Sequence, residues 1–135
     1  MRPEVFRGSA TAIITCFDEH GKLNMPAFEN LVEWQIEQGT DALVVCGTTG
    51  ESATLSDQEF ATLIEGAVKA AGGRIPVIAG TGSNNTEHAI QRSALAQTLG
   101  ANAILCVTPY YNKTTQRGLI AQWTKGGLMH APPIR

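Results

Sequence analysis

One short segment of this sequence carries two hydroxyls in a setting suited to acid–base chemistry. Residues 47–51 read Gly-Thr-Thr-Gly-Glu, so Thr48 and Thr49 lie between two glycines that permit tight turns. The backbone amides of such a loop can bind a carboxylate or phosphate, and a threonine hydroxyl can pass a proton. The segment lacks the Gly-Lys-Ser/Thr of a Walker A loop and the glycine spacing of a dinucleotide fingerprint. Taken alone, the segment fits equally well a loop that binds a small molecule and a βα turn that is merely rich in small residues.

Two adjacent tyrosines form the second candidate group. Tyr110 and Tyr111 follow a proline within Val107–Asn112, directly after an aliphatic run. Neighbouring side chains diverge, so the pair cannot face the same core. The sequence predicts that one ring packs while the other points into a pocket or across an interface. A tyrosine hydroxyl within reach of a threonine hydroxyl could relay a proton.

Apolar runs that read as strands alternate with helical patterns along the chain. The predicted strands are Ser9–Thr15, Ala42–Cys46, Pro76–Ala79 and Ala103–Thr108. The helical patterns run from Phe28 to Ile36, Phe60 to Ala71, Thr86 to Leu99 and, more weakly, Thr115 to Thr124. Ser56 and Glu59 predict a capping box for the second helix, and Asn84 or Asn85 opens the third.

This alternation predicts a parallel sheet covered by helices, with both candidate loops at the carboxyl ends of its strands. Four βα units fit an open doubly wound sheet or half of a (β/α)₈ TIM barrel, which typically needs about 250 residues. Periodicity alone leaves both architectures open.

Composition excludes several functional classes. The 135 residues carry a net charge of −2, which supports neither a nucleic-acid nor an anionic-membrane partner. No apolar run reaches the roughly 18 residues that a membrane span requires, and the first residues lack a secretory core. The sequence therefore predicts a cytoplasmic protein.

Cysteines and histidines show no catalytic or metal-binding spacing, so no metal or other cofactor is expected. The sequence predicts buried free thiols at Cys16, Cys46 and Cys106. It predicts solvated surface imidazoles at His20, His88 and His130.

Three motifs together resemble one enzyme family. Gly47–Leu55, Arg74–Gly82 and Val107–Asn112 are similar in order and spacing to motifs of the dihydrodipicolinate synthases, which are pyruvate-dependent lyases. The likeness covers about residues 8–124. Paired threonines favour this family over the related sialic acid lyase-like aldolases, which more often carry Gly-Ser-Thr-Gly-Glu. The resemblance implies a TIM barrel, and hence about four βα units in this chain.

The resemblance also implies a reaction. In the family, pyruvate forms a Schiff base with a lysine and condenses with aspartate semialdehyde, on the route to diaminopimelate and lysine. No cofactor is implied, and the expected assembly is a homo-oligomer, a homotetramer in the family. By motif position, Thr48 resembles the threonine of the family's proton relay. Thr48 and Thr49 together resemble the residues that bind the pyruvate carboxylate. Tyr111 resembles the relay tyrosine that reaches into an adjacent subunit.

A lysine feedback site at the subunit interface is implied as well. Its positions in this sequence are Ser52, Ala53, Asn84 and Tyr110. His88 stands where lysine-sensitive bacterial members commonly have a glutamate, which would weaken binding of the lysine ammonium.

The family's Schiff-base lysine falls beyond position 135, and none of Lys22, Lys69, Lys113 and Lys125 is placed to replace it. We therefore expect an N-terminal half-barrel over residues 1–124, an irregular tail over 125–135, and no synthase activity of this chain alone. Two alternatives are a non-catalytic half-barrel that acts by association and a different pyruvate aldolase of the superfamily.

Overall fold

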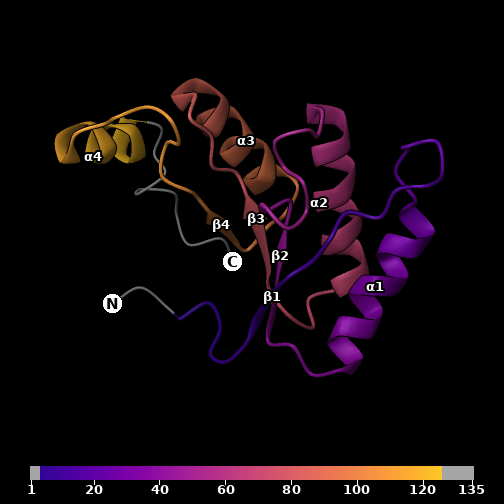
Figure 1. Cartoon of the computed structure of the whole chain (residues 1–135). Coiled ribbons are helices and arrows are strands. Elements are labelled where there is room, and N and C mark those ends of the chain that lie inside the picture. The colour runs from indigo at the N-terminus through magenta and orange to yellow at the C-terminus, as the bar shows by residue number, and fades with distance from the viewer. Residues whose placement is uncertain (1–3, 126–135) are drawn as a thin grey trace.

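In the computed structural model, which describes residues 4–125, four strands alternate with four helices (Figure 1). The strands are β1 (Ala10–Ala12), β2 (Ala42–Val45), β3 (Val77–Gly80) and β4 (Ala103–Leu105). The helices are α1 (Met25–Glu37), α2 (Asp57–Ala71), α3 (Thr86–Thr98) and α4 (Gln116–Lys125). Each element predicted from the sequence is therefore present. The predicted irregular tail begins one residue too early, since Lys125 ends α4. The rest of the predicted tail, with His130, lies outside the described residues.

The strands form one parallel sheet in the order β1-β2-β3-β4. Leu43 pairs with Val77, and Ile78 pairs with Ala103, so each new strand adds to the same edge. A doubly wound sheet reverses its strand order at a switch point. The sequential order observed here agrees instead with consecutive units of a barrel.

The main core lies between the sheet and helices α1, α2 and α3, which Figure 1 shows beside one another along the strands. Leu43 and Val45 of β2 point into it, as alternation along a strand requires. The largest fully buried side chains from the helices are Phe28, Val32, Phe60, Leu63 and Ile64. Since β2 and β3 are buried along their whole length, this layer fixes where their carboxyl ends lie.

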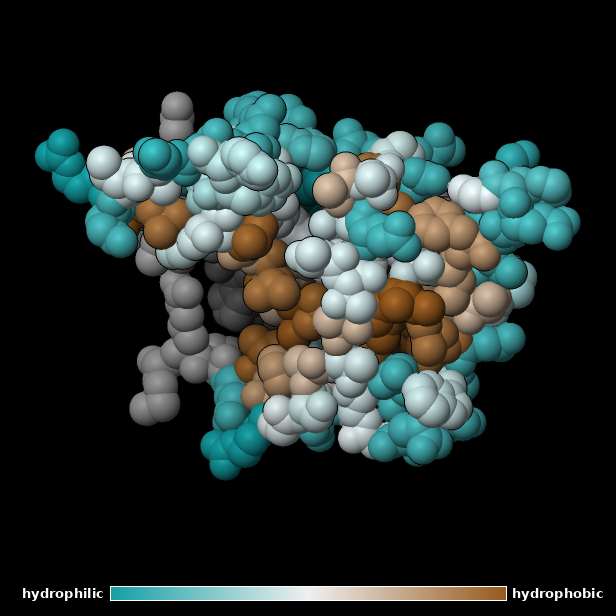
Figure 2. Space-filling model, viewed as in Figure 1, coloured by the Kyte–Doolittle hydropathy of each residue, from teal (hydrophilic) through white to brown (hydrophobic). Residues whose placement is uncertain are grey.

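The opposite face of the sheet is also apolar. Val44 and Ile78 form a second, smaller cluster with Ala42, against which Phe6 and Ala103 pack. Figure 2 shows hydrophobic residues gathered over the strands, with hydrophilic residues over the surrounding helices. Large apolar side chains among the exposed residues include Ile14, Leu105 and Val107. This face therefore resembles the inner wall of a barrel more than a solvated surface.

Local sequence signals account for the helix ends. The predicted capping box is confirmed: the Glu59 amide donates to Ser56 Oγ at 3.2 Å, and the Ser56 amide donates to Glu59 Oε2 at 2.8 Å. Gly72 ends α2 with a φ of 56°, in the left-handed region that glycine tolerates. Of the two asparagines considered for α3, Asn85 is the N-cap.

Two strands end three residues earlier than predicted, and β2 ends one residue earlier, at Val45. β1 stops at Ala12 rather than Thr15, and the Thr15 hydroxyl instead donates to the Gly50 carbonyl at 2.7 Å. β4 stops at Leu105 rather than Thr108, and beyond it the chain passes so near Gly82 that a Cβ there would collide with the Val107 backbone. In both places the chain leaves the sheet to support a neighbouring loop.

Candidate active site

The segment after β2, residues 46–56, carries the two threonines and has an unusual backbone. Cys46 and Glu51 adopt φ values of 56° and 59°, in the left-handed region that side chains other than glycine rarely occupy. Gly47 and Gly50 are buried, whereas Thr48 and Thr49 are exposed. The loop therefore turns its glycines inward and presents both hydroxyls at the carboxyl edge of the sheet.

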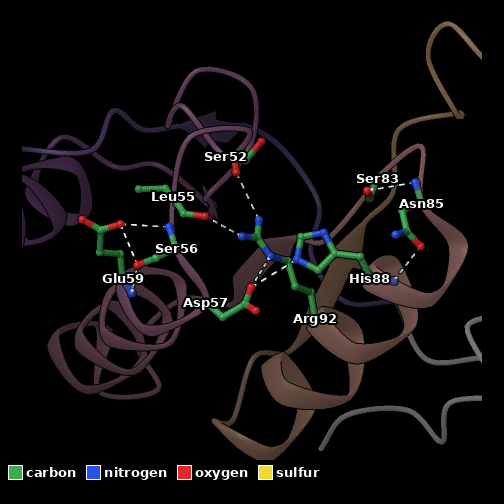
Figure 3. A network of polar contacts seen from close by, with 9 residues as sticks. All are labelled: Ser52, Leu55, Ser56, Asp57, Glu59, Ser83, Asn85, His88 and Arg92. Atoms are coloured by element: carbon green, nitrogen blue, oxygen red, sulfur yellow. Dashed lines mark hydrogen bonds and ion pairs between the residues drawn. The ribbon is translucent and has the colours of Figure 1, made fainter.

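Side chains from other parts of the chain hold this loop by its carbonyl groups. Thr15, after β1, donates to the carbonyl of Gly50. Arg92 of α3 donates from Nη1 to the Ser52 carbonyl at 3.1 Å and from Nη2 to the Leu55 carbonyl at 2.7 Å (Figure 3). Backbone carbonyls removed from water require such partners. The loop is thus anchored on both sides.

Asp57, the first residue of α2, joins the loop to α3. Its Oδ1 accepts from Arg92 Nε at 3.2 Å and lies 3.1 Å from His88 Nε2 (Figure 3). The hydrogen bond from His88, and then that from Arg92, hold the pKa of Asp57 below its usual value. The prediction that His88 is merely a solvated imidazole is wrong, since its ring is tied to this carboxylate.

The loops after β3 and β4 are also connected. Asn112 donates from Nδ2 to the Asn84 carbonyl at 2.7 Å. Tyr110 is 46% exposed, and Tyr111 is fully exposed with a φ of 62°. The expectation that one tyrosine packs within the chain is therefore wrong. Both tyrosine side chains are instead exposed within the described residues.

A pocket of about 570 Å³ lies between the loops after β2, β3 and β4. We call it the edge pocket. It brings together five of the residues singled out in the sequence: Thr48, Ser52, Ala53, Asn84 and Tyr110. His88 and Arg92 also line it. Thr49 and Tyr111 are not on its wall, and within residues 4–125 no hydrogen bond joins Thr48 to Tyr111.

The described lysines are remote from this chemistry. Lys22 lies in a turn, Lys69 on α2 and Lys113 in the loop after β4, and all three are exposed. None of these three side chains lines the pocket between the loops.

The cysteines differ from one another more than predicted. All three are free, but only Cys46 is buried, and Cys16 and Cys106 are half-buried. Burial raises the pKa of Cys46 to about 12 and also raises that of Cys16, so neither thiol is activated.

The described residues contain neither a candidate metal site nor a candidate membrane span. Across residues 4–125, no group of three or more His, Cys, Asp or Glu side chains is arranged to hold a metal ion. Within the same range, no helix has the length and apolar character of a membrane span.

Sequence reasoning missed Arg92 and Asp57. Arg92 lies among Ala89, Ser93 and Ala96 on the buried side of α3. A lone arginine among small residues at helical spacing is the signal that could have identified it, because a buried guanidinium needs partners. Its partners lie 35 to 40 residues away in the sequence, so their identity required the fold.

Comparison with known proteins agrees with this geometry. The Dihydrodipicolinate synthetase family matches residues 5–125. A 4-hydroxy-tetrahydrodipicolinate synthase from Thermoanaerobacter sp. (strain X514) is 54% identical over 121 residues, which are 90% of this chain and 40% of the relative. This chain thus spans about two fifths of the length of such a relative.

Two solved structures are similar as well. Dihydrodipicolinate synthase from Aquifex aeolicus has a TM-score of 0.86 at 50% identity, over 91% of this chain and 42% of that one. The chloride-inhibited enzyme from Acinetobacter baumannii, complexed with pyruvate, has a TM-score of 0.89 at 46% identity, over 93% of this chain and 43% of that one.

The ion pairs of Asp57 predict a pH dependence of stability. A lowered folded-state pKa stabilises the fold above the unfolded pKa of about 3.9, and this contribution is lost as pH falls through the folded value. We expect Asp57→Asn to lower stability at pH 6, by about 1 kcal/mol or less because Asp57 is mostly exposed. The difference from the parent should vanish by about pH 2.

Denaturant unfolding of both proteins between pH 2 and pH 6 measures this difference. Glu29→Gln on the exposed side of α1 is the control for loss of one negative charge. A deficit of Asp57→Asn that is as large at pH 2 as at pH 6 would contradict the assignment.

Proposed function

Because the chain belongs to the dihydrodipicolinate synthetase family and folds as four βα units of a TIM barrel, we propose that it supplies the N-terminal half of a Schiff-base lyase. The proposed reaction condenses pyruvate with aspartate semialdehyde, in the biosynthesis of diaminopimelate and lysine. The observation that most supports this proposal is that Thr48 and Thr49 are exposed on an anchored loop at the carboxyl edge of the sheet. That edge is where barrel enzymes keep their reacting groups.

The roles of the two threonines follow from their setting. Thr49, with Thr48, holds the carboxylate of pyruvate through hydroxyl and amide donors, because a glycine-rich turn leaves donors free to face an anion. Thr48 passes a proton between the substrate and Tyr111. Since Tyr111 is fully exposed, we propose that it completes the relay in a second subunit.

In this proposal, the reacting amine comes from outside residues 4–124. An imine forms when a lysine amine attacks the pyruvate carbonyl and water leaves, which requires an unprotonated amine beside the carboxylate site. The exposed positions of Lys22, Lys69 and Lys113 do not meet this requirement. The described half thus binds and transfers protons, while the nucleophile is carried elsewhere.

Association is part of the proposal. β1 and β4 are the edges of the described sheet, and an unpaired edge strand tends to add further strands. The apolar side chains of Ile14, Leu105 and Val107 add to the surface that burial would favour. We propose that further βα units close the sheet and that the closed units form a homo-oligomer, a homotetramer by family resemblance.

The relay predicts a loss of turnover in a complete enzyme. Residues 5–125 can replace the matched segment of the relative that is 54% identical, which supplies the remaining units. In this chimera, Thr48→Val and Tyr111→Phe should each lower kcat about 10²–10⁴-fold, the usual contribution of a positioned acid–base group. Steady-state rates of pyruvate and aspartate semialdehyde condensation measure the effect.

Thr62→Val, on the exposed face of α2, is the matched control and should leave kcat unchanged. Unchanged turnover in both relay variants would refute these roles. A chimera that folds but has no activity would favour the alternative in which this half-barrel acts only by association. Cleavage of a sialic acid in place of condensation would favour a different aldolase.

A second function is supported by the edge pocket, which we propose as a weak lysine site. Ser52, Ala53, Asn84 and Tyr110, the positions expected for feedback inhibition, share its wall. His88 also lines it, and an imidazole in either protonation state attracts an ammonium less than a carboxylate does. Feedback by lysine is therefore proposed to be weak.

Exchanging the partners of one ion pair tests this second function. Glutamate at position 88 alone would face the Asp57 carboxylate, so the variant is Asp57→His with His88→Glu, which keeps a histidine beside a carboxylate. In the chimera, the exchange should tighten lysine binding about 10-fold, because the carboxylate then lies on the pocket wall. Calorimetric titration with lysine measures the change.

The neutral variant His88→Gln should bind lysine as weakly as the parent sequence. Micromolar affinity in the parent sequence, or no gain in the exchanged pair, would contradict the proposed effect of His88.

A further inference from the structure

We infer that Arg92 is a positioning residue for the loop of residues 46–56, and thereby for Thr48 and Thr49. It acts on the main chain of that loop and is not proposed to touch substrate. The effect of Arg92 on turnover rests on the proposed function, whereas its effect on the position of the loop does not.

The first ground is the burial of a charge. Arg92 is only 6% exposed, although arginine is among the residues least often buried. A guanidinium without water must have its donors satisfied by protein acceptors. The only carboxylate recorded as its partner within residues 4–125 is Asp57, which is itself largely exposed. The other N–H donors of Arg92 are therefore available to hold other groups of the protein in place.

The second ground is the set of acceptors. Nε, Nη1 and Nη2 donate to Asp57, Ser52 and Leu55, so three groups of one plane reach three points along six residues. Two of the three acceptors are main-chain carbonyls. These two hydrogen bonds therefore depend on where the backbone of the loop lies and not on which side chains it carries. Figure 3 shows the guanidinium between α3 and this segment, facing each acceptor. The Arg92 Cζ lies 5.0 Å from the centroid of the Phe60 ring, which limits the orientation of the guanidinium plane.

The third ground is that the loop needs external support. Its internal bonds are short-range turns, such as Gly50 to Gly47 and Glu51 to Thr48, both with N–O distances of 3.0 Å. Such turns do not hold a segment against the sheet, and the positive φ values of Cys46 and Glu51 disfavour its conformation. Thr15 anchors the carbonyl of Gly50 from the β1 side. Arg92 supplies the corresponding anchor from the α3 side.

The geometry distinguishes arginine from lysine. A lysine ammonium could pair with Asp57, but a single nitrogen cannot reach three acceptors that match a planar fork. If the charge alone mattered, Arg92→Lys would be tolerated. If the fork positions the loop, Arg92→Lys should release Ser52 and Leu55 while keeping the ion pair.

Hydrogen–deuterium exchange of this chain tests the inference without any assay of activity. In Arg92→Lys, amide exchange in residues 47–55 should be about 10-fold faster or more, whereas exchange in residues 60–71 of α2 should be unchanged. Asp57→Asn removes the charged partner but keeps both carbonyl contacts, so its loop should exchange much as in the parent.

Equal acceleration of the loop and α2 in Arg92→Lys would overturn a local role, because it reports global destabilisation. An unchanged loop in Arg92→Lys would overturn it as well. Asp57→Asn that accelerates the loop as much as Arg92→Lys would assign the effect to the ion pair instead.

The chimera separates this inference from the proposed function. In the chimera, Arg92→Lys should lower kcat by about 10-fold. The same variant should also show the faster amide exchange of the loop. If the chimera has no condensation activity while the loop still responds to Arg92→Lys, the proposed function fails and the positioning role stands. Full kcat with a loosened loop would refute the link to Thr48 and Thr49.

Discussion

The carboxyl edge of this sheet depends on one constraint: where the short strands end, the backbone carbonyls of the following loops need hydrogen-bond partners. Here, side chains from other βα units pair them. Thr15 holds the carbonyl of Gly50, Arg92 holds those of Ser52 and Leu55, and Asn112 holds that of Asn84. Each of these bonds ties one loop to another unit. The loops are therefore connected to one another, and the edge pocket lies between those that follow β2, β3 and β4.

The fold could be predicted from the sequence because its signals are local. Apolar runs, helical spacing, the Ser56–Glu59 capping box and Gly72 each act within a few residues, and the structure has the corresponding elements. Strand ends were less predictable. A β-branched residue at a strand end can continue the ladder or leave it. Thr15 leaves the ladder, and its hydroxyl donates to the Gly50 carbonyl, 35 residues along the chain. The periodicity of apolar residues does not determine the order of the strands. It therefore could not distinguish a doubly wound sheet from half of a barrel.

The site was predictable only in part, and mainly through family resemblance. Resemblance singled out Thr48, Ser52, Ala53, Asn84 and Tyr110, which the fold gathers at one pocket. It did not indicate Arg92, because the contacts of this residue depend on how α3 crosses the loop. His88 was misjudged for the same reason, since its partner Asp57 lies 31 residues away. The left-handed backbone of Cys46, Glu51 and Tyr111 carries no glycine signature and had to be observed.

The central proposal is a division of labour, in which the described half-barrel would bind pyruvate and move protons while the reacting amine would lie outside residues 4–124. Borohydride reduction of this chain in the presence of labelled pyruvate tests it most directly, because reduction traps an imine on the lysine that formed it. The account predicts no retained label at Lys22, Lys69 or Lys113. Stoichiometric label at any one of these three lysines, located by peptide mass spectrometry, would contradict it.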